Sequence, residues 1–167
     1  MTCTYPGGPT VSFPRPAGWP AYFGTSSKNY HAYNEWVNTA FTNKKCIEDY
    51  LRTHPTPGTP QPATPQGTPN DATPSGLGDF GPSPVQSYAS TDSNGNPVVI
   101  NVTLPGHPLF PGYVARNVTG GPNNNQVNNY GEGTGWPQAG WSPIATPINN
   151  VWQGLTEEAI NACRCKN

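Results

Sequence analysis

Residues 97–104 read PVVINVTL, and this stretch has the most regular pattern in the chain. Alternation with a period of two is typical of a β-strand. As a strand, it has one face with Val98, Ile100, Val102 and Leu104 and another with Val99, Asn101 and Thr103. The preceding Ser-Asn-Gly-Asn at 93–96 is a turn signal. We therefore predict that a strand begins here after a turn.

Two further strands follow along the chain. GYVARNV at 112–118 and QVNNY at 126–130 are short and contain β-branched and aromatic residues. GGPNNN at 120–125 forms a loop between them. Strands that follow each other through short connections usually pair. The sequence therefore predicts a small antiparallel meander of three strands.

The N-terminal residues predict an extended arm followed by a helical segment. Residues 1–25 are rich in proline and aromatic side chains, so we expect an extended arm that packs on the body. Apolar side chains in residues 27–52 recur three and four residues apart, as in an amphipathic helix. They are Tyr30, Tyr33, Trp36, Val37, Ala40 and Phe41. A break at Thr42–Asn43 can divide this stretch into two helices.

The middle of the chain is dominated by proline. Residues 53–87 contain nine prolines, whose spacing excludes helices and sheet ladders. Polyproline-like backbone is expected, and both a flexible linker and a long loop over the body fit. A stretch rich in Gly, Pro and Trp follows at 131–155. Thr156 then caps a short helix at 157–164, with two acids in its first turn.

The predicted fold class is α+β, with an N-terminal helical segment, a Pro-rich irregular middle, a small antiparallel β-sheet and a short C-terminal helix. We expect a single domain over 1–167. It consists of an aromatic arm with helices at 1–52, a Pro-rich loop or linker at 53–87 and a β-rich core with the C-terminal helix at 88–167. A net charge of −1 and an aromatic content of 11% favour a folded chain over a disordered one.

The charge balance limits the classes of partner. Eight Lys and Arg residues form no basic stripe of the kind that grips nucleic acid. No apolar run is long enough for a membrane helix, so we expect no membrane association. We also expect the chain to be a monomer. The start, MTCTYPGGPTVSFPRP, lacks the regions of a signal peptide. We expect a domain that is secreted after removal of a signal or delivered into a target cell as part of something larger.

The cysteines favour disulfides. The four are Cys3, Cys46, Cys163 and Cys165. A Cys163–Cys165 bridge needs a very tight loop, so pairing of the C-terminal tail with Cys3 and Cys46 is the expectation. Disulfides indicate an oxidising compartment, while free thiols and a zinc site remain alternatives. No P-loop, HExxH or GxSxG motif is present, and we expect no cofactor.

Ionisable groups are scarce in the β-rich region. Between Ser93 and Thr156 the charged side chains are Arg116 and Glu132, joined by His107. Together they can perform acid–base chemistry, with Glu132 as the base, His107 as the acid and Arg116 as the anion clamp. Substrate contacts are predicted from neighbouring residues, namely Tyr113, Tyr130 and Thr134. The structural alternative is an Arg116–Glu132 ion pair between strands and a turn capped by His107.

PGHPLFPGYVAR at 105–116 and NNYGEGTGWPQ at 128–138 resemble C-terminal toxin domains of bacterial polymorphic toxins. The resemblance covers roughly residues 87–138. It implies an effector module used in interbacterial competition and neutralised by a cognate immunity protein.

Three functions follow from these patterns. The first is a metal-independent, ribonuclease-like hydrolase with an RNA or nucleotide substrate, acting through His107, Arg116 and Glu132. The second is an NAD-consuming toxin, a glycohydrolase or ADP-ribosyltransferase, which suits a chain of nearly neutral charge. The third is a non-enzymatic carbohydrate- or protein-binding module. Its aromatic faces can come from Trp19, Trp136, Trp141 and Trp152.

Overall fold

The computed structural model describes residues 1–39, 43–73, 81–121, 124–135 and 142–164. Its centre is a six-stranded antiparallel sheet with the strand order β3-β8-β7-β6-β5-β4. The strands are β3 (His31–Asn38), β4 (Thr68–Asp71), β5 (Pro84–Thr91), β6 (Pro97–Thr103), β7 (Gly112–Gly121) and β8 (Asn124–Gly133). The other elements are a hairpin of β1 (Thr2–Thr4) and β2 (Thr10–Ser12) and the helices α1 (Lys44–Thr53) and α2 (Ser142–Cys163).

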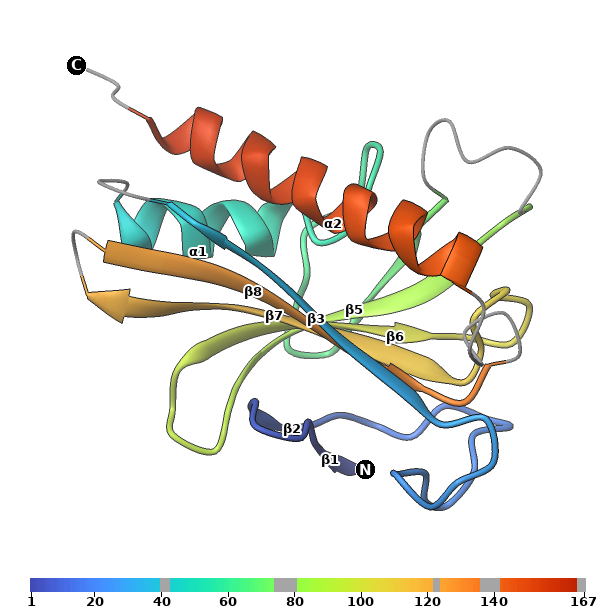
Figure 1. Ribbon diagram of the computed structural model, residues 1–167. Helices are drawn as coiled ribbons and strands as arrows, with labels where there is room; N and C mark the ends of the chain where they lie inside the picture. The colour runs from blue at the N-terminus through green and yellow to red at the C-terminus, as the bar shows by residue number, and fades with distance from the viewer. Residues whose placement is uncertain (40–42, 74–80, 122–123, 136–141, 165–167) are drawn as a thin grey trace.

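The sheet is covered on both faces, as Figure 1 shows. The two helices lie on one face, and the N-terminal arm with the β1–β2 hairpin lies across the other. The apolar cluster on the arm side includes Val11, Phe13, Trp19, Phe23, Ile100, Val102 and Tyr113. The cluster on the helix side includes Ile47, Leu51, Val99, Val118, Val127 and Ile160. The sheet therefore has a core on each side.

Strand β6 shows why PVVINVTL is apolar on both faces. Ile100 and Val102 pack on the arm side, whereas Val99 packs on the helix side. All three side chains are buried. β6 pairs with β7, and β7 pairs with β8, both antiparallel. The predicted three-strand meander is thus confirmed.

The predicted N-terminal helical segment is wrong over its first part. Residues 31–38 form the edge strand β3, which pairs with β8 from His31↔Gly133 to Asn38↔Gln126. Among the described residues of the predicted segment 27–52, helix occurs only in α1, where Asn43 caps the first turn by accepting a hydrogen bond from the Cys46 amide. Aromatic and β-branched residues at 33, 36 and 37 fit a strand as well as a helical stripe. Pairing with β8 decides between the two.

The sheet also extends beyond the three strands predicted. β4 and the start of β5 arise from the Pro-rich segment, with Pro69 on an edge strand and Pro84 at the first position of β5. These are the places where a strand tolerates proline. The buried Pro55 carbonyl accepts a hydrogen bond from Asn101 Nδ2 at 2.7 Å. The described part of 53–87 therefore packs on the body instead of forming a loose linker.

The C-terminal helix is long where a short one was predicted. α2 spans Ser142–Cys163, 22 residues, and begins inside the stretch at 131–155 that is rich in Gly, Pro and Trp. Pro143 lies in its first turn, where proline is tolerated, and Pro147 lies one turn further on. Both prolines obscured the start of the helix in the sequence. With two helices on a six-stranded sheet, the fold is dominated by the sheet, and the predicted fold class is corrected accordingly.

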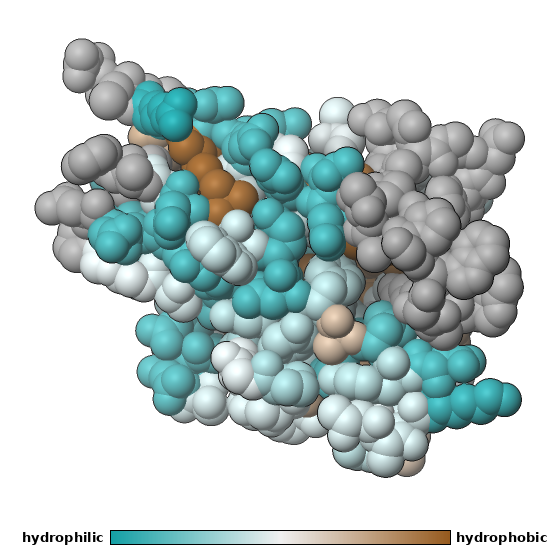
Figure 2. Space-filling model, in the orientation of Figure 1, coloured by the Kyte–Doolittle hydropathy of each residue, from teal (hydrophilic) through white to brown (hydrophobic). Residues whose placement is uncertain are grey.

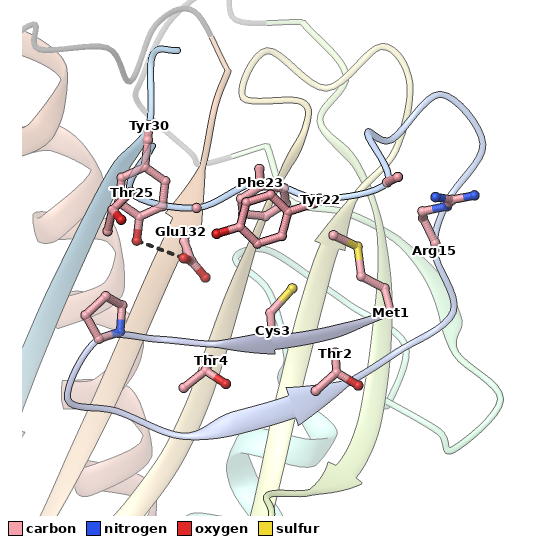
Figure 3. A pocket seen from close by; sticks show the side chains of 13 residues that line it. Met1, Thr2, Cys3, Thr4, Arg15, Tyr22, Phe23, Thr25, Tyr30 and Glu132 are labelled. Carbon is pink, nitrogen blue, oxygen red and sulfur yellow. Dashed lines mark hydrogen bonds between the residues drawn. The ribbon is translucent and has the colours of Figure 1, made fainter. Parts of the chain in front are cut away.

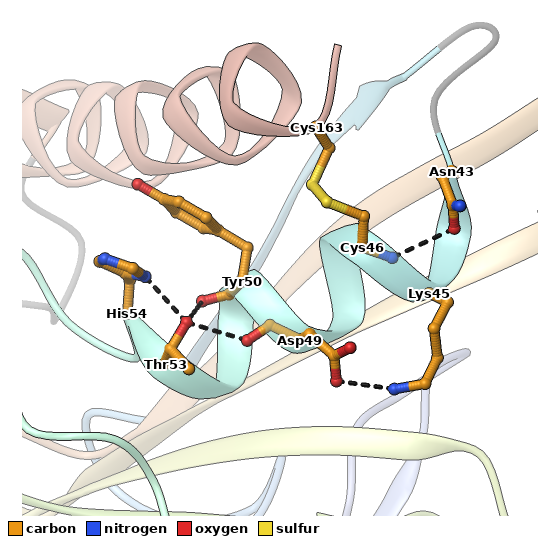
Figure 4. Close-up of a disulfide and its surroundings, with 8 residues drawn as sticks. All are labelled: Asn43, Lys45, Cys46, Asp49, Tyr50, Thr53, His54 and Cys163. Atoms are coloured by element: carbon orange, nitrogen blue, oxygen red, sulfur yellow. Dashed lines mark hydrogen bonds and ion pairs between the residues drawn. A yellow bond between two sulfur atoms is a disulfide. The ribbon is translucent and has the colours of Figure 1, made fainter. Parts of the chain in front are cut away.

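One disulfide joins the two helices. Cys46 in the first turn of α1 is bonded to Cys163 at the end of α2, as Figure 4 shows. The predicted bridge between the tail and the N-terminal half is thus present for Cys46. Cys3 is a buried free thiol, which corrects its assignment as a disulfide partner. Cys165 lies outside the described residues.

One face of the described molecule is mostly polar. Figure 2 shows this face, on which hydrophilic side chains predominate and one narrow hydrophobic strip lies near the upper left. Tyr22 and Trp36 are the exposed large hydrophobic side chains among the described residues. None of the helices in the described ranges is long and apolar enough to cross a membrane.

Gly131 provides a stability test of the β3–β8 pairing. A Cβ atom on this residue would overlap the ring of Tyr33, its cross-strand neighbour. The Tyr33 hydroxyl is held by Trp152 Nε1 at 2.9 Å, so the ring cannot move freely. We expect Gly131→Ala to lower the free energy of unfolding by about 1–3 kcal/mol in urea titrations. Gly121→Ala, where a Cβ meets open space, is the control, and equal losses in both variants would contradict this packing.

Candidate functional site

Glu132 lies near the end of β8, and its side chain points to the arm side of the sheet. Tyr113 Oη donates a hydrogen bond to Glu132 Oε2 at 2.5 Å, and Tyr30 Oη donates to Oε1 at 2.8 Å. Tyr113 is the cross-strand partner of Glu132 on β7, and Tyr30 immediately precedes β3. The Glu132 residue is 6% exposed. Two phenols from separate elements therefore fix its orientation.

A pocket of about 590 Å³ lies between the arm and this carboxylate. Figure 3 shows Glu132 at one end, the rings of Tyr22 and Phe23 in the middle and Arg15 at the other end. The lining also contains small and polar residues from the hairpin and the arm, namely Thr2, Cys3, Thr4, Pro6 and Thr25. We call this space the arm pocket. Its walls come almost wholly from residues 1–30, and β8 contributes Glu132.

Charged side chains in the arm pocket are sparse, although the Met1 ammonium, which donates to the Phe13 carbonyl at 2.7 Å, belongs to a residue that also lines it. Glu132 is the acidic side chain and Arg15 the basic one among the described residues that line it. Neither takes part in a salt bridge with another described residue. Burial, followed by the hydrogen bond to Glu132, raises the pKa of Tyr113 and of Tyr30. Both phenols therefore remain protonated donors to the carboxylate at neutral pH.

Cys3 lines the same pocket but is not a reactive nucleophile. Burial, with a smaller contribution from the negative charge of Glu132, raises the pKa of the Cys3 thiol to about 12. The thiolate is the nucleophilic form of cysteine. Cys3 is therefore present as a thiol and packs as a small apolar group in the arm-side cluster.

Arg116 lies on the opposite face of the sheet from Glu132. Arg116 is 1% exposed and lies beneath α2, with its guanidinium carbon 5.2 Å from the Trp152 ring centroid. Nε donates to Asn129 Oδ1 at 2.8 Å, and Nη1 donates to the carbonyls of His54 and Pro55 at 3.3 Å. Nη2 has no hydrogen-bond partner among the described residues. These contacts hold α2, β8 and the Pro-rich segment together.

A carboxylate balances Arg116 indirectly. Glu35 Oε2 accepts a hydrogen bond from Asn129 Nδ2 at 2.6 Å, so Asn129 connects the guanidinium to Glu35. Burial lowers the pKa of Arg116 to about 10, and the nearby Glu35 counteracts this shift. Arg116 remains charged at neutral pH. Its role in the described contacts is structural.

His107 occupies a third place, in the loop between β6 and β7. Its Nδ1 accepts a hydrogen bond from the Leu109 amide at 2.9 Å, and its own amide donates to the Leu104 carbonyl. Burial lowers the pKa of His107 to about 4, against a smaller opposing effect from Asp71 on β4. The imidazole is therefore neutral at pH 7. The turn-capping role that was the alternative for His107 is confirmed.

The pH dependence of stability tests this state of His107. Its pKa is about 4 when folded against 6.5 for the free side chain, so the unfolded chain binds the proton more tightly. This contribution to stability is complete above pH 6.5 and is lost as the pH falls toward 4, by on the order of 2–3 kcal/mol. His107→Asn retains an acceptor for the Leu109 amide but does not titrate. Urea unfolding at pH 7.5 and 4.5 should show a smaller acid loss in this variant, and an identical loss would refute the assignment.

The three predicted catalytic residues thus do not share one site. Glu132 faces the arm, Arg116 lies under the helices and His107 caps a turn. The alternative Arg116–Glu132 ion pair is also wrong, because adjacent strands turn these side chains to opposite faces. Side chains at opposed positions of paired strands share a face, and Glu132 is opposed to Tyr113, three residues before Arg116.

The predicted substrate-binding residues and tryptophans are distributed differently. Tyr113 contacts Glu132, as described, whereas the Tyr130 ring packs against Tyr5 with a centroid distance of 4.9 Å. Thr134 follows β8 and donates its amide to the Pro111 carbonyl. Trp19 and Trp152 are buried, so neither offers a free face. Trp136 and Trp141 lie outside the described residues.

Sequence reasoning missed the arm as part of a site. Tyr30, Tyr22 and Arg15 lie between 102 and 117 residues from Glu132 in sequence, and no spacing connects them. The available signal was the unusual aromatic content of residues 1–25, interpreted as packing. Among the described residues, no cluster of three or more His, Cys, Asp or Glu could hold a metal ion.

Comparison with known proteins gives a likeness of fold. No protein-family model matches the sequence, and no curated protein matches it significantly. The crystal structure of hypothetical protein jhp0584 from Helicobacter pylori aligns with a TM-score of 0.59 and 11% identity, over 92% of this chain and 99% of that one. Ara h 8.0201 aligns with a TM-score of 0.54 and 6% identity, over 80% and 97% of the two chains.

A third similar structure is the di-domain ARO/CYC StfQ from the steffimycin biosynthetic pathway. Its TM-score is 0.50 at 10% identity, and the match covers 80% of this chain and 50% of StfQ. The antiparallel six-stranded sheet with two helices of this chain matches these neighbours, which have the Bet v 1-like helix-grip fold. Identities this low establish the architecture and leave the function to the site.

Proposed function

We propose that the chain is a binding domain that holds a carbohydrate in the arm pocket, with Glu132 as the main hydrogen-bond acceptor. The observation that carries this proposal is the carboxylate itself. It is fixed by two phenols, lines a pocket and has no cationic partner among the described residues. Burying a carboxylate costs free energy unless hydrogen-bond donors interact with both of its oxygens.

Hydroxyl groups of a ligand can donate hydrogen bonds to the acceptor positions of Glu132 that the two tyrosines leave unused. A carboxylate has about four acceptor positions, and Tyr30 and Tyr113 use two of them. Two neighbouring hydroxyls of a sugar can donate to the other two. Hydrogen bonds to a charged acceptor contribute about 1.5–3 kcal/mol each. The carboxylate can therefore select a vicinal diol.

The aromatic wall supplies the complementary contact. Tyr22 is 69% exposed, an unusual state for a large aromatic side chain, and it lines the pocket beside Phe23. The C–H face of a sugar ring is apolar and stacks on such a ring, while its hydroxyls remain at the edge. A volume of about 590 Å³ fits the range of small-ligand pockets.

Isosteric replacement of Glu132 tests the proposal. In a glycan-array screen followed by calorimetric titration, Glu132→Gln should weaken binding of the sugars that the natural chain binds at least tenfold, because one charged acceptor becomes a neutral amide. Glu157→Gln, on the exposed face of α2, is the matched control and should bind like the natural chain. The proposal fails if no sugar on the array binds, or if both variants bind equally.

A second candidate is hydrolysis of NAD. The bond from ribose to a positively charged nicotinamide breaks with its electron pair going to the leaving group, so no general acid is required. One carboxylate can stabilise the developing positive charge on the sugar, and water then adds to that carbon and releases a proton. The single acidic group in the arm pocket favours this chemistry over ribonucleolysis, which needs an acid and a base together.

Assay of NAD consumption separates the two candidates. If the natural chain consumes NAD and Glu132→Gln does not, NAD hydrolysis is favoured over carbohydrate binding as the function of the arm pocket. The resemblance to polymorphic toxin domains remains a prediction with its own test, namely whether inducing the gene inside a bacterium stops growth. Growth arrest that persists in Glu132→Gln would place the toxic activity outside the arm pocket.

A further inference from the structure

The arm pocket has opposite charges at its two ends. Glu132 stands at one end and Arg15 at the other, with Tyr22 and Phe23 between them in Figure 3. Arg15 makes no salt bridge with any described residue, and its residue is exposed. The salt bridges among the described residues lie within α1, on the far face of the sheet. The guanidinium is therefore free to meet a ligand.

This arrangement separates the two charges instead of pairing them. If Glu132 and Arg15 were a structural ion pair, each would neutralise the other, and the pocket would favour neutral ligands. Here Glu132 is engaged by Tyr30 and Tyr113 on its own side of the pocket. The Arg15 guanidinium carries planar donors that match a carboxylate in two parallel hydrogen bonds. A ligand with donors at one end and an anion at the other satisfies both ends.

We propose that the carbohydrate bound in the arm pocket is an acidic one, of the uronic acid class. Its ring hydroxyls donate to Glu132, its apolar face stacks on Tyr22, and its carboxylate binds Arg15. This inference rests on the proposed function and adds the ligand class. A nucleic acid or polyphosphate is disfavoured at this site, because Glu132 would repel a chain of phosphates and only one basic side chain lines the described wall.

A matched pair of sugars gives the decisive measurement. Methyl β-glucuronide and methyl β-glucoside differ only at C6, which is a carboxylate in one and a hydroxymethyl group in the other. By ligand-observed NMR titration, the glucuronide should bind the natural chain three- to tenfold more tightly, because an exposed ion pair contributes modestly. Raising NaCl from 20 to 500 mM should reduce this preference by screening.

Two variants test which end of the arm pocket causes the preference for the glucuronide. Arg15→Gln should abolish the preference, so that this variant binds the glucuronide and the glucoside equally, and it should still fold, since Arg15 is on the surface. Glu132→Gln should weaken both sugars together. Arg52→Gln, an exposed arginine on α1, is the control and should retain the preference.

The outcomes distinguish failure of the acidic-ligand inference from failure of the proposed carbohydrate binding. Equal affinity for the two sugars, or a glucuronide preference that persists in Arg15→Gln, would overturn the acidic-ligand inference and leave carbohydrate binding intact. A glycan array on which neutral sugars bind and acidic ones do not would do the same. Absence of binding for every sugar, in the matched pair and on the array, would overturn both.

Discussion

Replacing Cys46 and Cys163 together by serine is expected to lower the free energy of unfolding by about 4–5 kcal/mol. The disulfide spans a sequence separation of 117 residues. Without it, the unfolded chain gains the conformational entropy that the closed loop had removed. Urea titration of the natural and double-serine chains, both folded under oxidising conditions, measures the difference.

Reduction of the natural chain provides the matching control. Dithiothreitol should bring its unfolding midpoint to that of the Cys46→Ser/Cys163→Ser variant and leave the variant unchanged. Cys3→Ser keeps the disulfide, so it should remain sensitive to the reductant. A stability difference below 1 kcal/mol would show that the α1–α2 pair is held by packing alone.

Arg116→Met is the second change with a large expected effect, about 3–5 kcal/mol of destabilisation. Methionine replaces most of the side-chain volume but none of the donors. The buried amide oxygen of Asn129 and the carbonyl of His54 would each lose a donor, and the Pro55 carbonyl would keep only its bond from Asn101 Nδ2. Loss of partners for buried acceptors carries their full desolvation cost.

Arg52→Met isolates the effect of burial. Arg52 is an exposed arginine on α1, so its replacement should change stability by no more than about 0.5 kcal/mol. Both variants are compared by urea unfolding at pH 7, where Arg116 is charged. If Arg116→Met is as stable as Arg52→Met, the guanidinium contributes nothing to the cohesion of the helix layer, and its contacts are incidental.

The strands of the meander were predictable because their signal is local. PVVINVTL has a period that describes a strand whatever surrounds it, and short loops connect it to its neighbours. Residues 31–38 carry no such unambiguous signal, since Tyr33, Trp36 and Val37 fit two periods. Their conformation follows from hydrogen bonds with β8, which lies about 95 residues later in the chain. Long-range pairing of this kind is invisible in a window of a dozen residues.

The candidate site was predicted in part. The scarcity of charge drew attention to Glu132, which lines the arm pocket, and the glycines beside it lie in β8, where Tyr33 covers Gly131. The same scarcity of charge led to the prediction that Arg116 and His107 share a catalytic site with Glu132, which their positions exclude. Each of the three is explained by burial or by specific hydrogen bonds, but the partners differ. Counting ionisable groups identifies residues under constraint and does not show where they meet.

The sequence by itself determined the central strands, because their pattern depends on a local period, and it offered the turn at His107 as one of two alternatives. Tertiary structure alone decided which face each side chain occupies. It folded the aromatic arm over the sheet to build a pocket on Glu132, and it placed Arg116 beneath α2. The physical reason is that alternation in a strand fixes opposite faces but leaves open which elements will cover them.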